Sequence, residues 1–156
     1  MKNTMENTNF SLNCGERELR KMRDHEFLVQ YRRTVKQMLE QGQVVVRKTA
    51  VMHALAAAKP LFYVSFHRAQ TVMWELFYKG GLRTVARTER QAMWLDLYGK
   101  VKAEMQKHPN LSMPQALART LYSARADRLY LNPSYAYKLL YRIQQNNKRK
   151  NRLNEL

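Results

Sequence analysis

Residues that cross-link a chain or build metal sites are scarce in this sequence. The 156 residues include one cysteine, Cys14, and four histidines. One cysteine cannot form an internal disulfide, and this scarcity is typical of a cytoplasmic protein. The histidines show no ligand spacing, and no cysteine lies near any of them. We therefore expect no metal and no other cofactor.

Long apolar runs are missing as well. No stretch approaches the roughly 18 apolar residues that a transmembrane helix needs. The N-terminal segment MKNTMENTNFSLNCG is polar and has no apolar region of the kind found in signal peptides. We therefore expect a cytoplasmic protein without a membrane partner, with association with a nucleoid or a virion as further alternatives.

Negative charge is the third scarcity. Asp and Glu number 12 against 28 Lys and Arg, which gives a formal net charge of +16 and an isoelectric point near 10.3. The acidic residues are scattered singly and no glycine-rich phosphate loop is present, so we predict that the protein is not an enzyme. The excess positive charges repel one another unless an anionic partner is near. Nucleic acid is the commonest such partner, followed by an anionic membrane surface or an acidic protein.

Helical periodicity is what the sequence does contain. Apolar residues make up 45% of the chain and recur at spacings of three and four, which is typical of amphipathic helices. Ser65, Thr88, Ser112 and Asn132 are of types that cap helix starts. We expect an all-α fold of about six helices. The expected helices cover residues 16–40, 45–58, 66–79, 89–107 and 113–123, and a last one starts after Asn132.

Two stretches indicate an internal duplication: LFYVSFHRAQTVMWEL (residues 61–76) and RLYLNPSYAYKLLYRI (residues 128–143). An offset of 67 aligns a tyrosine, a capping residue and an alanine in the two stretches: Tyr63 with Tyr130, Ser65 with Asn132, and Ala69 with Ala136. We predict two tandem three-helix, helix-turn-helix-like units. These units cover residues 16–80 and 81–147, between a disordered polar tail (1–15) and a basic tail (148–156).

The last predicted helix and the tail after it carry the clearest functional signal. Residues 128–154 contain seven Lys or Arg and no Asp or Glu, with tyrosines between the cations. Cations hold nucleic-acid phosphates, and tyrosines stack on bases or bond to the backbone. We therefore predict a nucleic-acid-binding protein, more specifically a DNA-binding regulator or packaging protein of a bacterium or phage. The candidate contact residues are Tyr135, Lys138, Arg142, Gln145, Lys148, Arg149, Lys150, Arg152, Arg68, Arg83 and Arg87.

Two other functions stay open at this point. A helical assembly protein, forming a homo-oligomer or docking on an acidic protein, would also use the nine methionines and the two tryptophans, Trp74 and Trp94. RNA binding would produce the same composition as DNA binding. A basic helix face is also common on proteins that bind no nucleic acid, because charged residues simply cover the solvent side of a helix.

Overall fold

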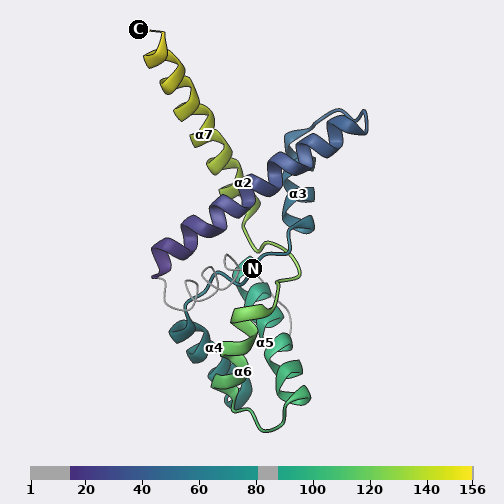
Figure 1. Ribbon diagram of the computed structural model, residues 1–156, viewed down its shortest axis with the longest axis vertical. Coiled ribbons are helices and arrows are strands. Elements are labelled where there is room, and N and C mark those ends of the chain that lie inside the picture. The colour runs from purple at the N-terminus through teal and green to yellow at the C-terminus, as the bar shows by residue number, and fades with distance from the viewer. Residues whose placement is uncertain (1–14, 81–87, 156) are drawn as a thin grey trace, which may run out of the picture.

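The computed structural model describes residues 15–80 and 88–155. Within these residues it contains six α-helices and no strand, which confirms the expected all-α class (Figure 1). The helices are α2 (Glu16–Glu40), α3 (Arg47–Ala57), α4 (Phe66–Tyr78), α5 (Glu89–Lys107), α6 (Met113–Ser123) and α7 (Pro133–Asn154).

Local sequence signals explain where most of these helices begin. The side chains of Ser65, Thr88 and Asn132 each accept a hydrogen bond from a backbone N–H in the first turn of α4, α5 and α7. Ser112 and Gln115 form a reciprocal capping box at the start of α6. Each cap satisfies an N–H group that the helix itself leaves without a partner. The four predicted caps are therefore confirmed.

The helices pack in two groups, each around its own hydrophobic core (Figure 1). The α2–α3–α7 core buries Phe27, Val51, Ala54, Leu55, Ala58, Leu129, Leu131, Ala136, Leu139 and Leu140. The α4–α5–α6 core buries Phe62, Val64, Ala69, Met73, Leu76, Trp94, Leu97, Val101, Met113, Ala116, Leu117, Leu121 and Ala126. Each core is thus completed by a helix from the other half of the chain.

Two connectors join the cores: residues 58–65 lead from α3 to α4, and residues 124–132 lead from α6 to α7. The N–H of Ala126 donates to the carbonyl of Pro60 (2.7 Å), and the N–H of Leu129 donates to the carbonyl of Leu55 at the end of α3 (2.9 Å). The second of these bonds uses one of the carbonyls that a helix end leaves free. The connectors therefore pass each other and are fastened together between the two cores.

The structure does not show the two tandem units predicted for residues 16–80 and 81–147, because each group of helices combines helices from both halves of the chain. The third helix of the first unit, α4, packs with α5 and α6, whereas α7 packs with α2 and α3. Side-chain burial nevertheless repeats between the halves. Buried positions of α3 coincide with buried positions of α6 at an offset of 66: Ala50 with Ala116, Val51 with Leu117, Ala54 with Thr120, and Leu55 with Leu121.

Some expectations for the ends of the chain are corrected or lie outside the described residues. Leu39 in the last turn of α2 has an apolar side chain that is 62% exposed, and the chain turns three residues later at Gly42, whose φ is +71°. The basic tail from residue 148 continues α7 as helix up to Asn154. The expected polar tail, apart from Gly15, lies outside the described residues, as do the candidate contacts Arg83 and Arg87.

Candidate nucleic-acid interface

Helix α7 has two halves with different surroundings. In its first half, Ala136, Leu139 and Leu140 are buried in the α2–α3–α7 core. In its second half every residue from 146 to 155 is exposed. The second half of the helix therefore projects from the body, and no other described helix lies beside it (Figure 1).

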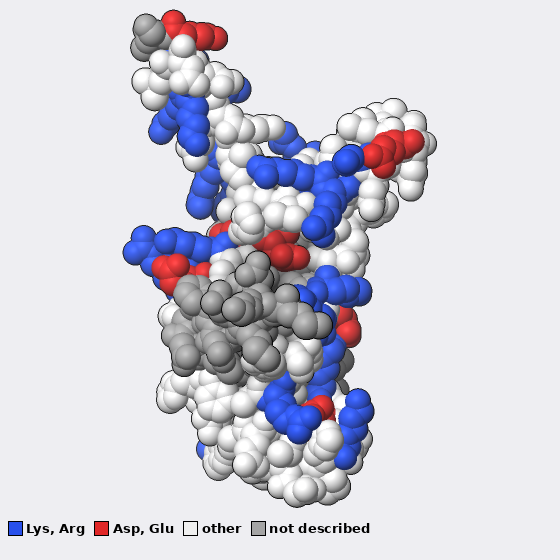
Figure 2. Space-filling view, viewed as in Figure 1, with Lys and Arg blue, Asp and Glu red and all other residues white. Residues whose placement is uncertain are grey.

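Five of the predicted contact residues lie on one side of α7. They follow one another at spacings of four, three, four and three: Lys138, Arg142, Gln145, Arg149 and Arg152. Because a helix turns once in about 3.6 residues, this spacing forms a single stripe about 21 Å long, opposite the apolar side of the helix. We call these five residues the basic stripe. Blue side chains mark this projecting end of the molecule in Figure 2.

The cations of the basic stripe are not neutralised by any residue that the structure describes. Lys138, Arg142, Arg149 and Arg152 are exposed and make no ion pair or side-chain hydrogen bond with a described residue. Two predicted cations of α7 are not part of the stripe. The helical period places Lys148 beside the stripe and Lys150 on the far side of the helix. The stripe therefore offers four unpaired positive charges along one line.

Tyr135, predicted as a candidate contact residue, makes contacts within the protein. Its hydroxyl donates to Asp24 Oδ2 (2.8 Å) on α2, and the Arg23 guanidinium lies 5.2 Å from its ring centroid. Burial, followed by the hydrogen bond to Asp24 and the charge of that carboxylate, raises the pKa of Tyr135. Its hydroxyl is already used to hold α7 on α2.

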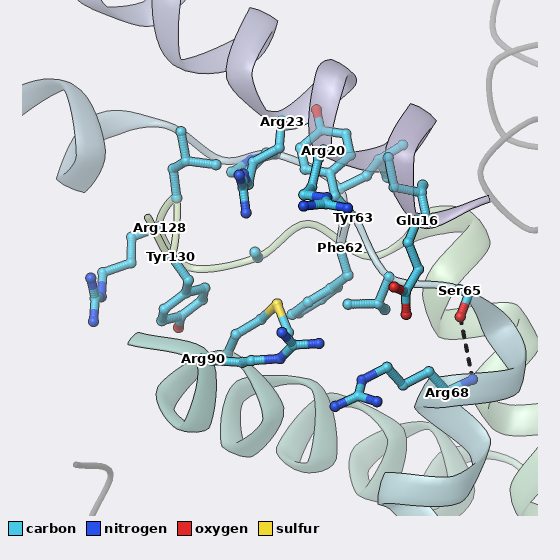
Figure 3. Close-up of a pocket in the computed structure, with 17 residues that line it drawn as sticks. Glu16, Arg20, Arg23, Phe62, Tyr63, Ser65, Arg68, Arg90, Arg128 and Tyr130 are labelled. Atoms are coloured by element: carbon cyan, nitrogen blue, oxygen red, sulfur yellow. Dashed lines mark hydrogen bonds between the residues drawn. The ribbon is translucent and has the colours of Figure 1, made fainter. Parts of the chain in front are cut away.

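Arg68, predicted as an isolated contact, lies in a cleft between the two groups of helices. The cleft has a volume of about 280 Å³. Five arginines line it, from three helices and a connector: Arg20 and Arg23 on α2, Arg68 on α4, Arg90 on α5, and Arg128. We call it the arginine cleft (Figure 3).

Two of these arginines are engaged with neighbouring acids. Arg23 Nη2 lies 3.1 Å from Asp24 Oδ1, and Arg128 Nη1 lies 2.6 Å from Glu89 Oε2. The Arg128 guanidinium also stacks on the ring of Tyr130, 4.5 Å from its centroid. These two side chains are therefore held as parts of the cleft wall.

The other three arginines of the cleft have no ion-pair partner in the described part of the chain. Arg20, Arg68 and Arg90 are exposed and make no ion pair with a described residue. Their guanidinium groups point toward the same space, near the carboxylate of Glu16 (Figure 3). One carboxylate faces three unpaired guanidinium groups there, so the cleft keeps a positive excess.

Asp96 fixes one wall of the arginine cleft. Its side chain is 6% exposed, and its Oδ2 accepts hydrogen bonds from the Tyr130 hydroxyl (2.8 Å) and the Asp127 N–H (2.9 Å), while Lys100 pairs with its Oδ1. Burial alone would lower the pKa of Lys100, but the hydrogen bonds and charges of Asp127 and Asp96 together outweigh it and raise the pKa. The hydrogen bond from Lys100 also lowers the pKa of Asp127. This network ties α5 to the second connector.

Of the five arginines of the cleft, only Arg68 was predicted from the sequence as a contact residue. Arg20 and Arg128 are 108 positions apart in the numbering. No spacing rule connects residues that meet only through the packing of separate helices. The signal that would have found them is the position of the helix groups, which the sequence pattern did not provide.

Other kinds of site find no support in the described part of the chain. No cluster of three or more His, Cys, Asp or Glu side chains suited to a metal ion occurs among the described residues. None of the described helices combines the length and apolarity needed to cross a membrane. Comparisons with models of known families, with curated proteins and with solved structures found no match for this chain. Function is therefore inferred from the side chains themselves.

Proposed function

We propose that the protein binds nucleic acid without catalysing a reaction, and that duplex DNA is its target. The observation that carries this proposal is the basic stripe, with four unpaired cations along one side of a projecting helix. Each cation that replaces a condensed counterion on a phosphate adds to affinity. A regulatory and a packaging role would use the same contact.

The dimensions of α7 favour DNA over double-stranded RNA. A helix with side chains is about 10–12 Å across, which matches the roughly 12 Å major groove of B-form DNA. The major groove of A-form RNA is too narrow and deep to be read in this way. Arg142 and Gln145 near the middle of the basic stripe are of the types that pair with base edges. The stripe therefore provides both phosphate contacts and candidates for base contacts.

We also propose that the chain contains two copies of one helix-turn-helix-like pattern, which exchange their third helices. The repeated caps at Ser65 and Asn132 and the matched burial of α3 and α6 support this. In the DNA-binding motif, the last helix of such a unit reads the groove. Helix α7 is the last helix of the second copy and carries the basic stripe.

Salt dependence of DNA binding tests the proposed function. Log affinity for a duplex is measured against log salt concentration for the wild type and for the double variant Lys138→Gln/Arg142→Gln. Each lost phosphate contact lowers the slope by about 0.9, so we expect a decrease of roughly two. The matched control is Lys102→Gln/Lys107→Gln, which removes the same charge from exposed positions of α5.

The outcomes of that experiment separate a localised contact from general charge. A slope lowered in the α7 variant and kept in the control supports the proposal. Equal decreases in both variants, or an unchanged slope with binding retained, would exclude the basic stripe as the contact. Removing the residues after Asn147 should lower the slope further, because Arg149 and Arg152 are lost with it. A duplex RNA of equal length is expected to bind more weakly than the DNA.

A second candidate function rests on a separate apolar surface. At the turn between α2 and α3, Leu39 is 62% exposed, Val44 84% and Val46 53%. Exposed apolar side chains grouped in this way are common where proteins associate. Light scattering of Val44→Ser/Val46→Ser tests assembly: loss of a defined oligomer in this variant would favour the assembly function over DNA binding.

A further inference from the structure

The arginine cleft has the features of a small-anion site that is separate from the basic stripe. Arg20, Arg68 and Arg90 come from α2, α4 and α5 and point into one space (Figure 3). Unpaired like charges that converge in a cleft repel one another, and a bound anion relieves that repulsion. The planar guanidinium fork also matches the oxygens of a phosphate better than an ammonium group does.

The remaining walls of the cleft indicate what kind of molecule the bound phosphate belongs to. Beside the arginines lie Leu61, Tyr63, Met93 and Tyr130, which give the cleft an apolar and aromatic side. Its volume of about 280 Å³ lies just below the range of about 300–1,000 Å³ for small-molecule pockets. The cleft is therefore suited to about one nucleotide held at its phosphate end, and is much too small for a duplex.

We propose that the arginine cleft binds the phosphate of a nucleotide, with Arg20, Arg68 and Arg90 as the contacting cations and Tyr63 and Tyr130 beside the base or sugar. This phosphate chemistry has two sources: a free mononucleotide, or a nucleotide within single-stranded nucleic acid. The proposal does not depend on the basic stripe, because α7 contributes no residue to the lining of the cleft.

Calorimetry with a purine nucleoside diphosphate and the full-length protein tests this site. The unphosphorylated nucleoside is the matched ligand control. We expect the diphosphate to bind at least about tenfold more tightly than the nucleoside, because each charged hydrogen bond to phosphate contributes a factor of that order. The variant Arg68→Gln/Arg90→Gln should lose at least about tenfold in affinity for the diphosphate.

Two further variants separate a built phosphate site from general positive charge. Arg68→Lys/Arg90→Lys keeps the charge and loses the guanidinium fork, so its affinity should fall between the wild type and the glutamine variant. Lys102→Gln/Lys107→Gln removes the same charge elsewhere and should bind the diphosphate like the wild type. Circular dichroism confirms that each variant is folded, which we expect because the changed side chains are exposed.

Competition identifies the source of the phosphate. A single-stranded oligonucleotide that displaces the diphosphate points to a strand, whereas failure to displace it points to a free nucleotide. The proposal is overturned if the wild type does not bind the diphosphate, if the nucleoside binds equally well, or if the control variant loses as much affinity as the glutamine variant. Lys138→Gln/Arg142→Gln should keep diphosphate binding, so failure of the cleft and failure of the stripe are told apart.

Discussion

The two connectors occupy equivalent places between the cores but are fastened differently. In residues 58–65, Phe62 and Val64 enter the α4–α5–α6 core while Tyr63 packs on the α2–α3–α7 core. In residues 124–132 the pattern is mirrored: Leu129 and Leu131 enter the α2–α3–α7 core while Tyr130 packs on the other. Each connector therefore joins both cores through the alternation of its side chains.

The difference between the connectors lies in their polar contacts. The Tyr130 hydroxyl donates to Asp96, whereas no described side chain hydrogen-bonds to the Tyr63 hydroxyl. Lys59 of the first connector donates to the backbone carbonyl of Asp127 in the second. Apolar packing is thus repeated in the two halves, but the polar network belongs mainly to the second connector.

The largest expected effect comes from separating the two halves of the chain. Fragments 1–84 and 85–156 each contain parts of both cores, because α4 and α7 complete the core of the other half. We expect each fragment alone to be largely unfolded and an equimolar mixture to recover helicity, as measured by far-ultraviolet circular dichroism. Two tandem units would behave differently: each fragment would fold on its own and mixing would change nothing.

A large effect is also expected from truncating one residue in each core. Phe27 and Leu97 are both 0% exposed, so Phe27→Ala should cost about 3–5 kcal/mol and Leu97→Ala about 2–5 kcal/mol of unfolding free energy. Both tryptophans, Trp74 and Trp94, lie in helices around the α4–α5–α6 core, so fluorescence reports on that group and circular dichroism on both. Because the connectors are fastened together, we expect the two cores to unfold together. The unfolding transitions measured by fluorescence and by circular dichroism should then coincide in each variant. Separate transitions in Phe27→Ala would show that the cores unfold independently.

An intermediate effect should distinguish the two connector tyrosines. Tyr130→Phe removes a hydrogen bond to a carboxylate that is almost fully buried, and it should cost about 1.5–3 kcal/mol in urea denaturation. Tyr63→Phe removes no such bond and should stay within about 0.5 kcal/mol of the wild type. Equal losses in the two variants would contradict the difference drawn between the connectors.

The smallest expected effect is a change in alkaline stability. Burial, followed by the charge of Glu26, raises the pKa of Tyr63 to about 12, above the value near 10 of a free tyrosine. The stability that this shift contributes is present below pH 10 and is lost as the pH rises through 12, since the unfolded chain releases the proton more readily. Denaturation between pH 9 and 12 should therefore show a shallower loss for Tyr63→Phe than for the wild type. Tyr141→Phe, which alters an exposed hydroxyl, is the control and should follow the wild type.

Much of the fold was predictable because helices are specified locally. The caps at Ser65, Ser112 and Asn132 involve residues at most three positions apart, and spacings of three and four define the buried side of each helix. The bounds of α2 and α6 agree with the expected residues 16–40 and 113–123. The basic stripe is local in the same sense, since its spacing depends on the helical period alone.

Residue order and helical period were thus enough for the helices, their caps and the line of cations on α7. The grouping of helices was not available from them, because the helical period defines the apolar side of α4 and of α7 but not the helices against which each side packs. That choice depends on the connectors, whose alternating side chains and backbone hydrogen bonds act between residues more than 60 positions apart. The arginine cleft and the bond from Tyr135 to Asp24 follow from the same choice. The cleft exists only once the two groups of helices lie against each other, since no local rule brings Arg20, Arg68 and Arg90 together. The bond from Tyr135 to Asp24 exists only once α7 packs on α2.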